Sequence, residues 1–170
     1  MKTATLESKF PLLAVENGCI ISKDADITVA YRVELPELFT LTRAEYEAMH
    51  STWAKAVKVL PNYSIVHKQD FFVEESYKPD ICKDSLSFLS RSFERHFNER
   101  PYLQHTCYLF LTKTTKERSR TTSSFNALTR GFIIPKEMQD QDTVTRFLES
   151  CGQFERIVND SGLLRITRLT

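Results

Sequence analysis

The segment Ile27 to Leu35, ITVAYRVEL, alternates apolar and polar side chains, and this alternation constrains the fold more than any other feature of the sequence. A period of two residues is typical of a β-strand that buries one face. The short apolar run Cys19 to Ile21 precedes it, and the polar residues Lys23 to Asp26 lie between the two runs. We therefore predict a β-hairpin at the start of the fold.

After Pro36 the period changes to three and four residues, which indicates an amphipathic helix from about residue 42 to residue 60. Thr42 and Glu45 match a capping box at its start. Pro61 ends it. We expect Trp53 to be buried, on one inward stripe with four other apolar side chains: Tyr46, Met49, Val57 and Leu60.

Segments with the two-residue period of a strand and segments with the three- and four-residue period of a helix continue to alternate through the rest of the chain. Strands are predicted at 64–73, 106–112 and 163–169, and the second has apolar residues on both faces, as in a central strand. A helix capped by Asp84 ends before Pro101, with a stripe of Leu86, Leu89, Phe93 and Phe97. A third helix runs from Asp142 to Gly162 with seven inward side chains: Val144, Phe147, Leu148, Cys151, Phe154, Ile157 and Val158.

This order predicts an α+β fold in which a β-hairpin is followed by alternating helices and strands, with a mixed sheet and helices mainly on one face. A chain of 170 residues fits a single domain, 1–170. The net charge of +1 argues against a general polyanion-binding protein. Four separated cysteines without a CxxC pair indicate free thiols in a reducing cytosol: Cys19, Cys82, Cys107 and Cys151. With Glu7 in place of an apolar signal core and no run of about 18 apolar residues, we expect a soluble, unexported chain.

The sequence predicts no catalytic, cofactor-binding or metal-binding residue, and we expect the chain not to be an enzyme. Its four glycines form neither a phosphate-binding loop nor a dinucleotide fingerprint. His105 and Cys107 would share a strand face, but a buried structural cysteine is the simpler reading. His50, His67 and His96 lie on different elements. The pairs Asp24 with Asp26 and Asp140 with Asp142 suit turns and helix starts better than acid–base chemistry.

One segment, 113–130, is strongly basic and rich in serine and threonine. It is either a contact surface for phosphates or an acidic partner, or a solvated loop. Its candidate contact residues are Lys113, Lys116, Arg118, Arg120 and Arg130.

A nucleic-acid-binding module with this basic loop is the alternative function. RNA-recognition modules use a related α+β plan with exposed strand aromatics. Arg130-Gly131-Phe132 matches the first three places of one of their motifs, but Ile133, Ile134 and Pro135 then depart from it. Tyr108 and Phe110 are the aromatic pair on a strand.

Read as a whole, the stretch TLESKFPLLAVENGCIISKDADITVAYRVELPELFTLT resembles the start of the TraG proteins of Bacteroides-type conjugative transposons. Those proteins are similar to the large ATPases of type IV secretion systems. The resemblance continues through IVHKQDFFVEESY, LSFLSRSFERHFNERPYL, CYLFLTKTTKERSR and TRFLESCGQFERIVNDSG, so it extends over nearly the whole chain.

The resemblance implies an N-terminal domain whose role is docking and oligomer contact. The ATP-binding motor would lie further along the parent protein, and no catalytic residue carries over to this chain. The implied partners are other conjugation proteins at the inner membrane and the parent's own ATPase domain. The implied location is the cytoplasm, at the membrane through those partners.

Overall fold

A computed structural model of the protein describes residues 10–77, 87–114 and 141–170. These residues form three α-helices, one short 3-10 helix, η1 (Leu38–Thr40), and six strands, which confirms the α+β class. The chain divides into two compact units. Unit 1 comprises Met1–Lys68 and Tyr108–Thr170, and unit 2 comprises Gln69–Cys107. Two long strands, β4 (Ser64–Ser76) and β5 (Pro101–Lys113), contribute residues to both units.

Unit 1 begins with two successive hairpins formed by β1 (Leu12–Glu16), β2 (Cys19–Ser22) and β3 (Ile27–Glu34). The predicted hairpin of β2 and β3 is confirmed, and the Ser22 hydroxyl accepts hydrogen bonds from two amides of its turn. Strand β1 was not predicted. It joins β2 through Asn17 and Gly18, which both have positive φ, as a two-residue type I′ turn requires.

We predict that Gly18→Ala lowers the free energy of unfolding by about 1–2 kcal/mol, because φ is +67° at this glycine and a side chain is strained there. The added Cβ would also lie 3.4 Å from the Leu169 carbonyl oxygen, with the Arg168 guanidinium close by. Urea denaturation measures the loss. Gly152→Ala is the matched control: nothing lies within 4 Å of its Cβ position, so this helical alanine should raise stability by about 0.5–1 kcal/mol. Equal effects of the two variants would contradict the turn geometry.

The strand order is β1-β2-β3-β5-β4, and β6 (Arg165–Arg168) also pairs with β3. The sheet is antiparallel, so the mixed sheet that we expected is wrong. The reason lies in the strand order. The helical connection from β3 to β4 does bring in a strand of the same direction, but β5 lies between these two strands and runs the opposite way.

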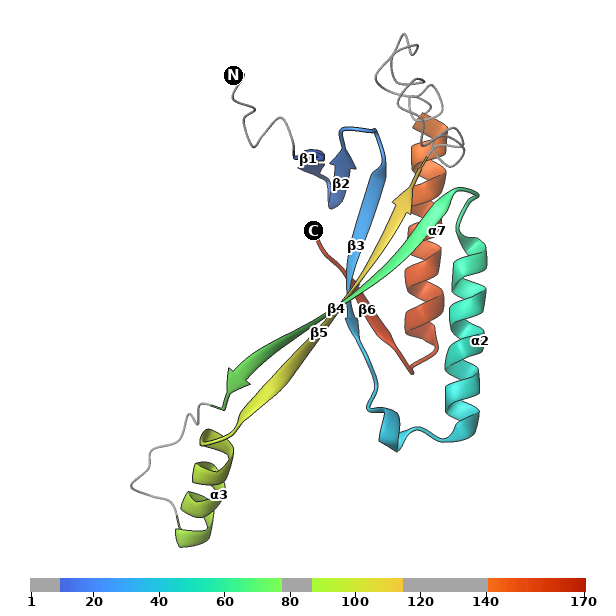
Figure 1. The fold of residues 1–170 in the computed structure, drawn as a ribbon. Helices are drawn as coiled ribbons and strands as arrows, with labels where there is room; N and C mark the ends of the chain where they lie inside the picture. The colour runs from blue at the N-terminus through green and yellow to red at the C-terminus, as the bar shows by residue number, and fades with distance from the viewer. Residues whose placement is uncertain (1–9, 78–86, 115–140) are drawn as a thin grey trace, which may run out of the picture. The chain divides into compact units, whose positions relative to one another are not determined.

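The helices α2 (Arg43–Val59) and α7 (Gln141–Asp160) each connect two strands that are separated by one further strand. β3, α2 and β4 form one such split β-α-β unit, and β5, α7 and β6 form the other. Figure 1 shows α2 and α7 side by side, covering one face of the sheet in unit 1. The prediction of helices on one face is confirmed for this unit.

The core of unit 1 lies between this helix pair and the sheet. Strand β5 alternates between buried and more exposed side chains along its second half. Strand β3 buries Val29, Tyr31 and Val33 as the sequence predicts, but Ala30, which was expected on the polar face, is buried as well. Four of the seven expected α7 side chains are fully buried, and the Tyr31 hydroxyl donates a hydrogen bond to the Cys151 carbonyl oxygen, 3.2 Å away. The completely buried members of this core are Val29, Tyr31, Ala56, Leu109, Leu111, Phe147, Cys151, Phe154 and Val158.

The stripe expected on α2 is only partly right. Trp53 is half-buried and meets Phe154 edge to face at 5.6 Å between ring centroids, but Tyr46 and Val57 are exposed. The fully buried residue of α2 is Ala56. Its small side chain lies where α2 packs most closely on the rest of unit 1. The buried side of α2 therefore faces away from Tyr46 and Val57.

Two local polar contacts fix the ends of these helices. Thr42 and Glu45 form the predicted capping box, and the hydrogen bonds from Thr42 lower the pKa of the Glu45 carboxyl. At the other helix, the Asn159 side chain donates to the carbonyl of Ile166 and accepts from its amide. This pair of bonds holds the start of β6 against the end of α7.

Candidate docking surface

Unit 2 contains helix α3 (Phe88–Asn98), which has no buried residue. Its N-cap is Ser87, whose hydroxyl accepts from the Ser90 amide. The predicted cap Asp84 and the stripe residue Leu86 lie outside the described residues. Phe88, Leu89 and Phe93 are 81%, 78% and 62% exposed. An ordinary surface helix buries such side chains, so their exposure marks a surface suited to a partner.

The apolar face of α3 consists of Leu89, Phe93 and Phe97, which follow one another at intervals of four residues and so lie on one side of the helix. Phe97 packs on Phe93, with 4.5 Å between ring centroids, and meets Tyr77 edge to face at 6.5 Å. These ring contacts connect the apolar face of α3 to the end of β4. On the opposite side the helix carries Arg91 and Arg95, so its faces differ in both polarity and charge.

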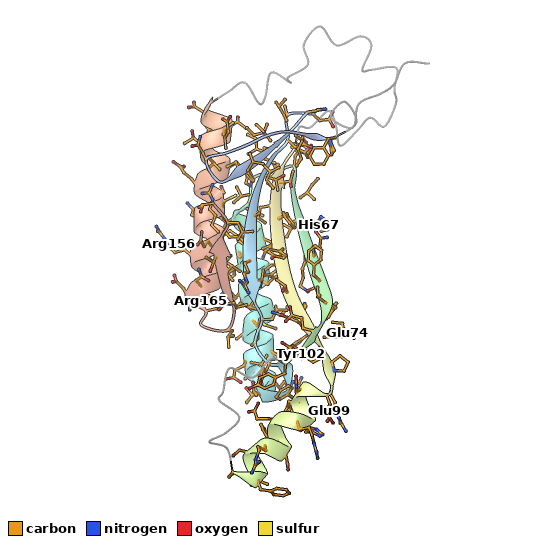
Figure 2. All side chains as sticks on the ribbon, turned by 90° about the vertical axis from the view of Figure 1, so that its left-hand side faces the viewer. His67, Glu74, Glu99, Tyr102, Arg156 and Arg165 are labelled. Carbon is orange, nitrogen blue, oxygen red and sulfur yellow. The ribbon has the colours of Figure 1, made fainter. Side chains whose placement is uncertain are left out.

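The strand part of unit 2 also exposes large apolar side chains. Phe72 stacks on His105 with 4.6 Å between ring centroids and an interplanar angle of 8°. His105 Nε2 lies 2.8 Å from Asp70 Oδ1, so the imidazole pairs with a carboxylate across the two strands. Cys107 is buried, in agreement with its interpretation as a structural cysteine. Figure 2 shows Glu74 and Tyr102 further along these strands, where the Tyr102 hydroxyl donates to Glu75.

The face of the sheet away from α2 and α7 carries aromatic side chains in unit 1. Tyr108 and Phe110 alternate along β5 with the buried residues Cys107, Leu109 and Leu111, and are themselves half-exposed. The His67 ring lies 5.9 Å from that of Phe110. In Figure 2, His67 and Arg156 of α7 lie on opposite sides of the unit.

Of the candidate contact residues in the basic segment, the structure describes Lys113. It is buried: its Nζ donates to the Asn62 carbonyl oxygen at 2.6 Å and lies 5.6 Å from the centre of the Tyr63 ring. Tyr63 has a positive φ, and the Thr114 amide donates to its carbonyl oxygen. The charge of Lys113 therefore stabilises this turn. The other candidates lie outside the described residues: Lys116, Arg118, Arg120 and Arg130.

The remaining histidines lie on three different elements. His50 is on α2, His67 is on β4, and His96 on α3 contacts the Phe97 ring. Within 10–77, 87–114 and 141–170, no group of three His, Cys, Asp or Glu side chains could hold a metal ion. No helix in this part of the chain is long and apolar enough to cross a membrane.

The aspartate pairs lie at a turn and at a helix start. Asp24 lies in the turn before β3, Asp142 is in the first turn of α7, and Asp140 is outside the described residues.

Comparison with known proteins finds a family model that covers part of the chain. A family model described as a domain of unknown function from a B. theta gene description (DUF3875) matches residues 1–51, a region that ends within α2. No curated protein matches the chain. The matched region contains both N-terminal hairpins and precedes the whole of unit 2.

Sequence reasoning identified the apolar stripe of α3 but expected it to be covered, as in the other two helices. A period of three and four residues is the same for a helix that packs on its own sheet and for one that awaits a partner. Periodicity alone therefore does not tell whether Leu89 and Phe93 are covered or exposed. An isolated helix of 11 residues is marginally stable in water, so α3 gains stability from contact with another surface.

Proposed function

We propose that this chain is a non-catalytic docking and oligomer-contact domain, and that α3 of unit 2 makes the contact. The observation that carries this proposal is the exposure of Phe88, Leu89 and Phe93 on a helix with no buried residue. Interface centres are enriched in aromatic side chains, and a few such anchors supply most of the binding energy. The partner is a protein surface with an apolar groove that accepts the α3 apolar face.

The parent protein that we propose is a TraG-type conjugation ATPase of the type IV secretion family. The similarity of several segments in the same order, described above, supports this parent. The description of the matching family model names a B. theta gene, which is consistent with a protein of Bacteroides-type conjugative transposons. The partners are then other conjugation proteins at the inner membrane, or further copies of the parent. The basic residues Lys116, Arg118, Arg120 and Arg130 remain a second proposed contact. The coding sequence beyond residue 170 tests the parent directly: an in-frame phosphate-binding loop supports it, and its absence contradicts it.

We predict that Leu89→Ser combined with Phe93→Ser in the full-length protein lowers conjugative transfer at least tenfold, while protein abundance is unchanged. The loss of two interface anchors costs more than about 1.4 kcal/mol of binding free energy, which corresponds to this factor. Neither side chain is buried, so the fold should be stable. Transfer frequency and immunoblotting measure the two quantities.

Phe39→Ser is the matched control, because Phe39 is 86% exposed and lies on η1 of unit 1. It removes a similar exposed apolar area elsewhere and should leave transfer unchanged. Normal transfer by the α3 variant, or an equal loss in both variants, would contradict docking through α3. Light scattering of the isolated chain then distinguishes a second copy of this chain from a different protein as the partner. If the chain self-associates and the α3 variant does not, the partner is a second copy.

The alternative function, nucleic-acid binding, is supported by Tyr108 and Phe110 on the face of β5 away from the helices. Aromatic side chains on a central strand can stack on unpaired bases. Binding of a single-stranded oligonucleotide that weakens with salt and is abolished by Phe110→Ala would favour this alternative over docking.

A further inference from the structure

The two strands at the ends of the strand order, β1 and β4, differ in how well they are protected against pairing with another chain. β1 has five residues, and its register with β2 shifts between Leu12 and Ala14. A short strand and an irregular register are two devices that keep a sheet edge from adding a further strand. β4 has 13 residues and contains neither proline nor glycine. In the described part of the chain its one neighbouring strand is β5, so its other edge is open to a further strand.

The side chains of β4 are arranged so that the strand complements itself when a second copy runs antiparallel to it. Its basic residues, His67 and Lys68, precede the apolar run Phe71 to Val73. Two acidic residues, Glu74 and Glu75, follow that run. When Phe71 lies opposite Phe71 of the second copy, the acidic pair of each strand lies opposite the basic pair of the other. Lys68 already takes part in an interaction within its own chain, and its three N–H donors can keep that contact while it faces a carboxylate.

The two adjacent symmetric registers place like charges opposite each other. A pair centred on Asp70 brings two aspartates together, and a pair centred on Phe72 brings Asp70 opposite Glu74. Like charges directly opposite each other destabilise a strand pair. Of the symmetric registers along β4, the one centred on Phe71 places the largest number of basic residues opposite acidic ones. The sequence of β4 therefore favours an antiparallel second copy in this register.

We propose that the open edge of β4 is a dimerisation site, at which β4 of a second copy adds antiparallel with Phe71 of both copies at the two-fold axis. Residues 66–76 of the two strands then form roughly ten main-chain hydrogen bonds, as many as a standard protein interface contains. Two-fold pairs that use the same surface on both copies are the commonest oligomers. A net charge of +1 gives little repulsion between the copies. This contact goes beyond the one proposed for α3 and does not depend on it.

Light scattering of the 170-residue chain over a range of concentrations tests the dimer. We expect the mass to rise from that of one chain to that of two, with a dissociation constant in the micromolar range. Phe71→Lys and Phe71→Glu each bring like charges together at the axis, so each should weaken association at least about tenfold. An equimolar mixture of the two variants should associate again, because lysine then faces glutamate. Phe39→Lys, at an exposed phenylalanine of η1, is the matched control and should dimerise like the wild type.

Hydrogen exchange of the wild-type chain at low and high concentration tests the same contact without a substitution. Amides of residues 66–76 should become more protected as the concentration rises, and those of β1 should not. The variant Leu89→Ser with Phe93→Ser should still dimerise, so a failure of the α3 proposal is distinguishable from a failure of this one.

Three results would overturn the proposal. The first is a mass of one chain at all concentrations up to about 1 mM. The second is a dimer in which α3 rather than β4 gains protection. The third is a mixture of Phe71→Lys and Phe71→Glu that does not associate although circular dichroism shows that both variants are folded.

Discussion

Phe154→Ala should lower the free energy of unfolding by about 3–5 kcal/mol, the loss typical of deleting a buried aromatic ring. Phe154 is completely buried on α7, and its ring meets Trp53 of α2 edge to face, with an interplanar angle of 76°. The substitution removes apolar contacts with the sheet together with the ring contact that joins the two helices. Because a domain of this size has a total stability of about 5–15 kcal/mol, the variant should lose a large fraction of its stability.

Urea denaturation monitored by Trp53 fluorescence measures this loss, and circular dichroism provides a second signal that does not depend on the ring contact. Phe154→Leu fills most of the space and should cost clearly less than the alanine variant. Phe39→Ala, at an exposed phenylalanine, should change stability by no more than about 0.5 kcal/mol. A loss below about 1 kcal/mol for Phe154→Ala would contradict the packing of α2 on α7.

Local signals in the sequence predicted the elements of unit 1 well. The alternation at 27–35 gave strand β3, the Thr42 and Glu45 pair gave the start of α2, and Gly162 marked the end of α7. Each of these depends on neighbours in the chain: a period of two, a capping box, and a glycine with positive φ. Such features are visible in a sequence because no distant residue takes part in them.

Strand β1 could have been predicted from the same kind of signal. Asn17-Gly18 is the residue pair that a type I′ turn prefers, and Leu12 to Val15 provide an apolar run before it. The extra length of β4 and β5 was not accessible in this way. Their residues in unit 2 are mostly exposed, so the pattern of burial that identifies a strand in a sequence is missing there.

The proposed contact surfaces depend on pairing between segments that are distant in the chain. The strand at 64–73 was predicted, but its place at the end of the strand order follows from the position of β5 between β3 and β4. The stripe of α3 was visible, but periodicity does not specify what covers it. Sequence reasoning therefore identified residues of both surfaces without predicting that β4 is an edge strand and that the stripe of α3 is exposed.

The second large effect concerns pH. Burial raises the pKa of the Cys151 thiol from 9.0 to about 12. Arg168 lowers this pKa and Cys19 raises it, both by smaller amounts. Burial likewise raises the pKa of the Tyr31 hydroxyl well above 10.0. The two groups are neighbours, since the Tyr31 hydroxyl donates to the Cys151 carbonyl oxygen. In the unfolded chain both groups lose their protons at lower pH than in the folded protein.

The contribution of these two groups to stability should therefore be constant from neutral pH to about pH 9 and fall as the pH rises from 9 to 12. In this range the unfolded chain binds fewer protons than the folded one, so the free energy of unfolding decreases with pH. The raised pKa of Cys151 alone corresponds to about 4 kcal/mol at the end of the range. Urea denaturation at a series of pH values between 7 and 11.5 measures the slope.

Tyr31→Phe and Cys151→Ala should each flatten this slope, although both lower stability at pH 7 by removing a hydrogen bond or buried volume. The loss of stability at pH 7 shifts the whole curve of unfolding free energy against pH downward, whereas the loss of a titrating group changes its slope. The two effects can therefore be measured separately. Tyr46→Phe, which removes a hydroxyl from an exposed side chain, is the matched control. If the double variant Tyr31→Phe with Cys151→Ala unfolds at alkaline pH as steeply as the wild type, then other groups cause the alkaline loss, and the buried pair between β3 and α7 does not control it.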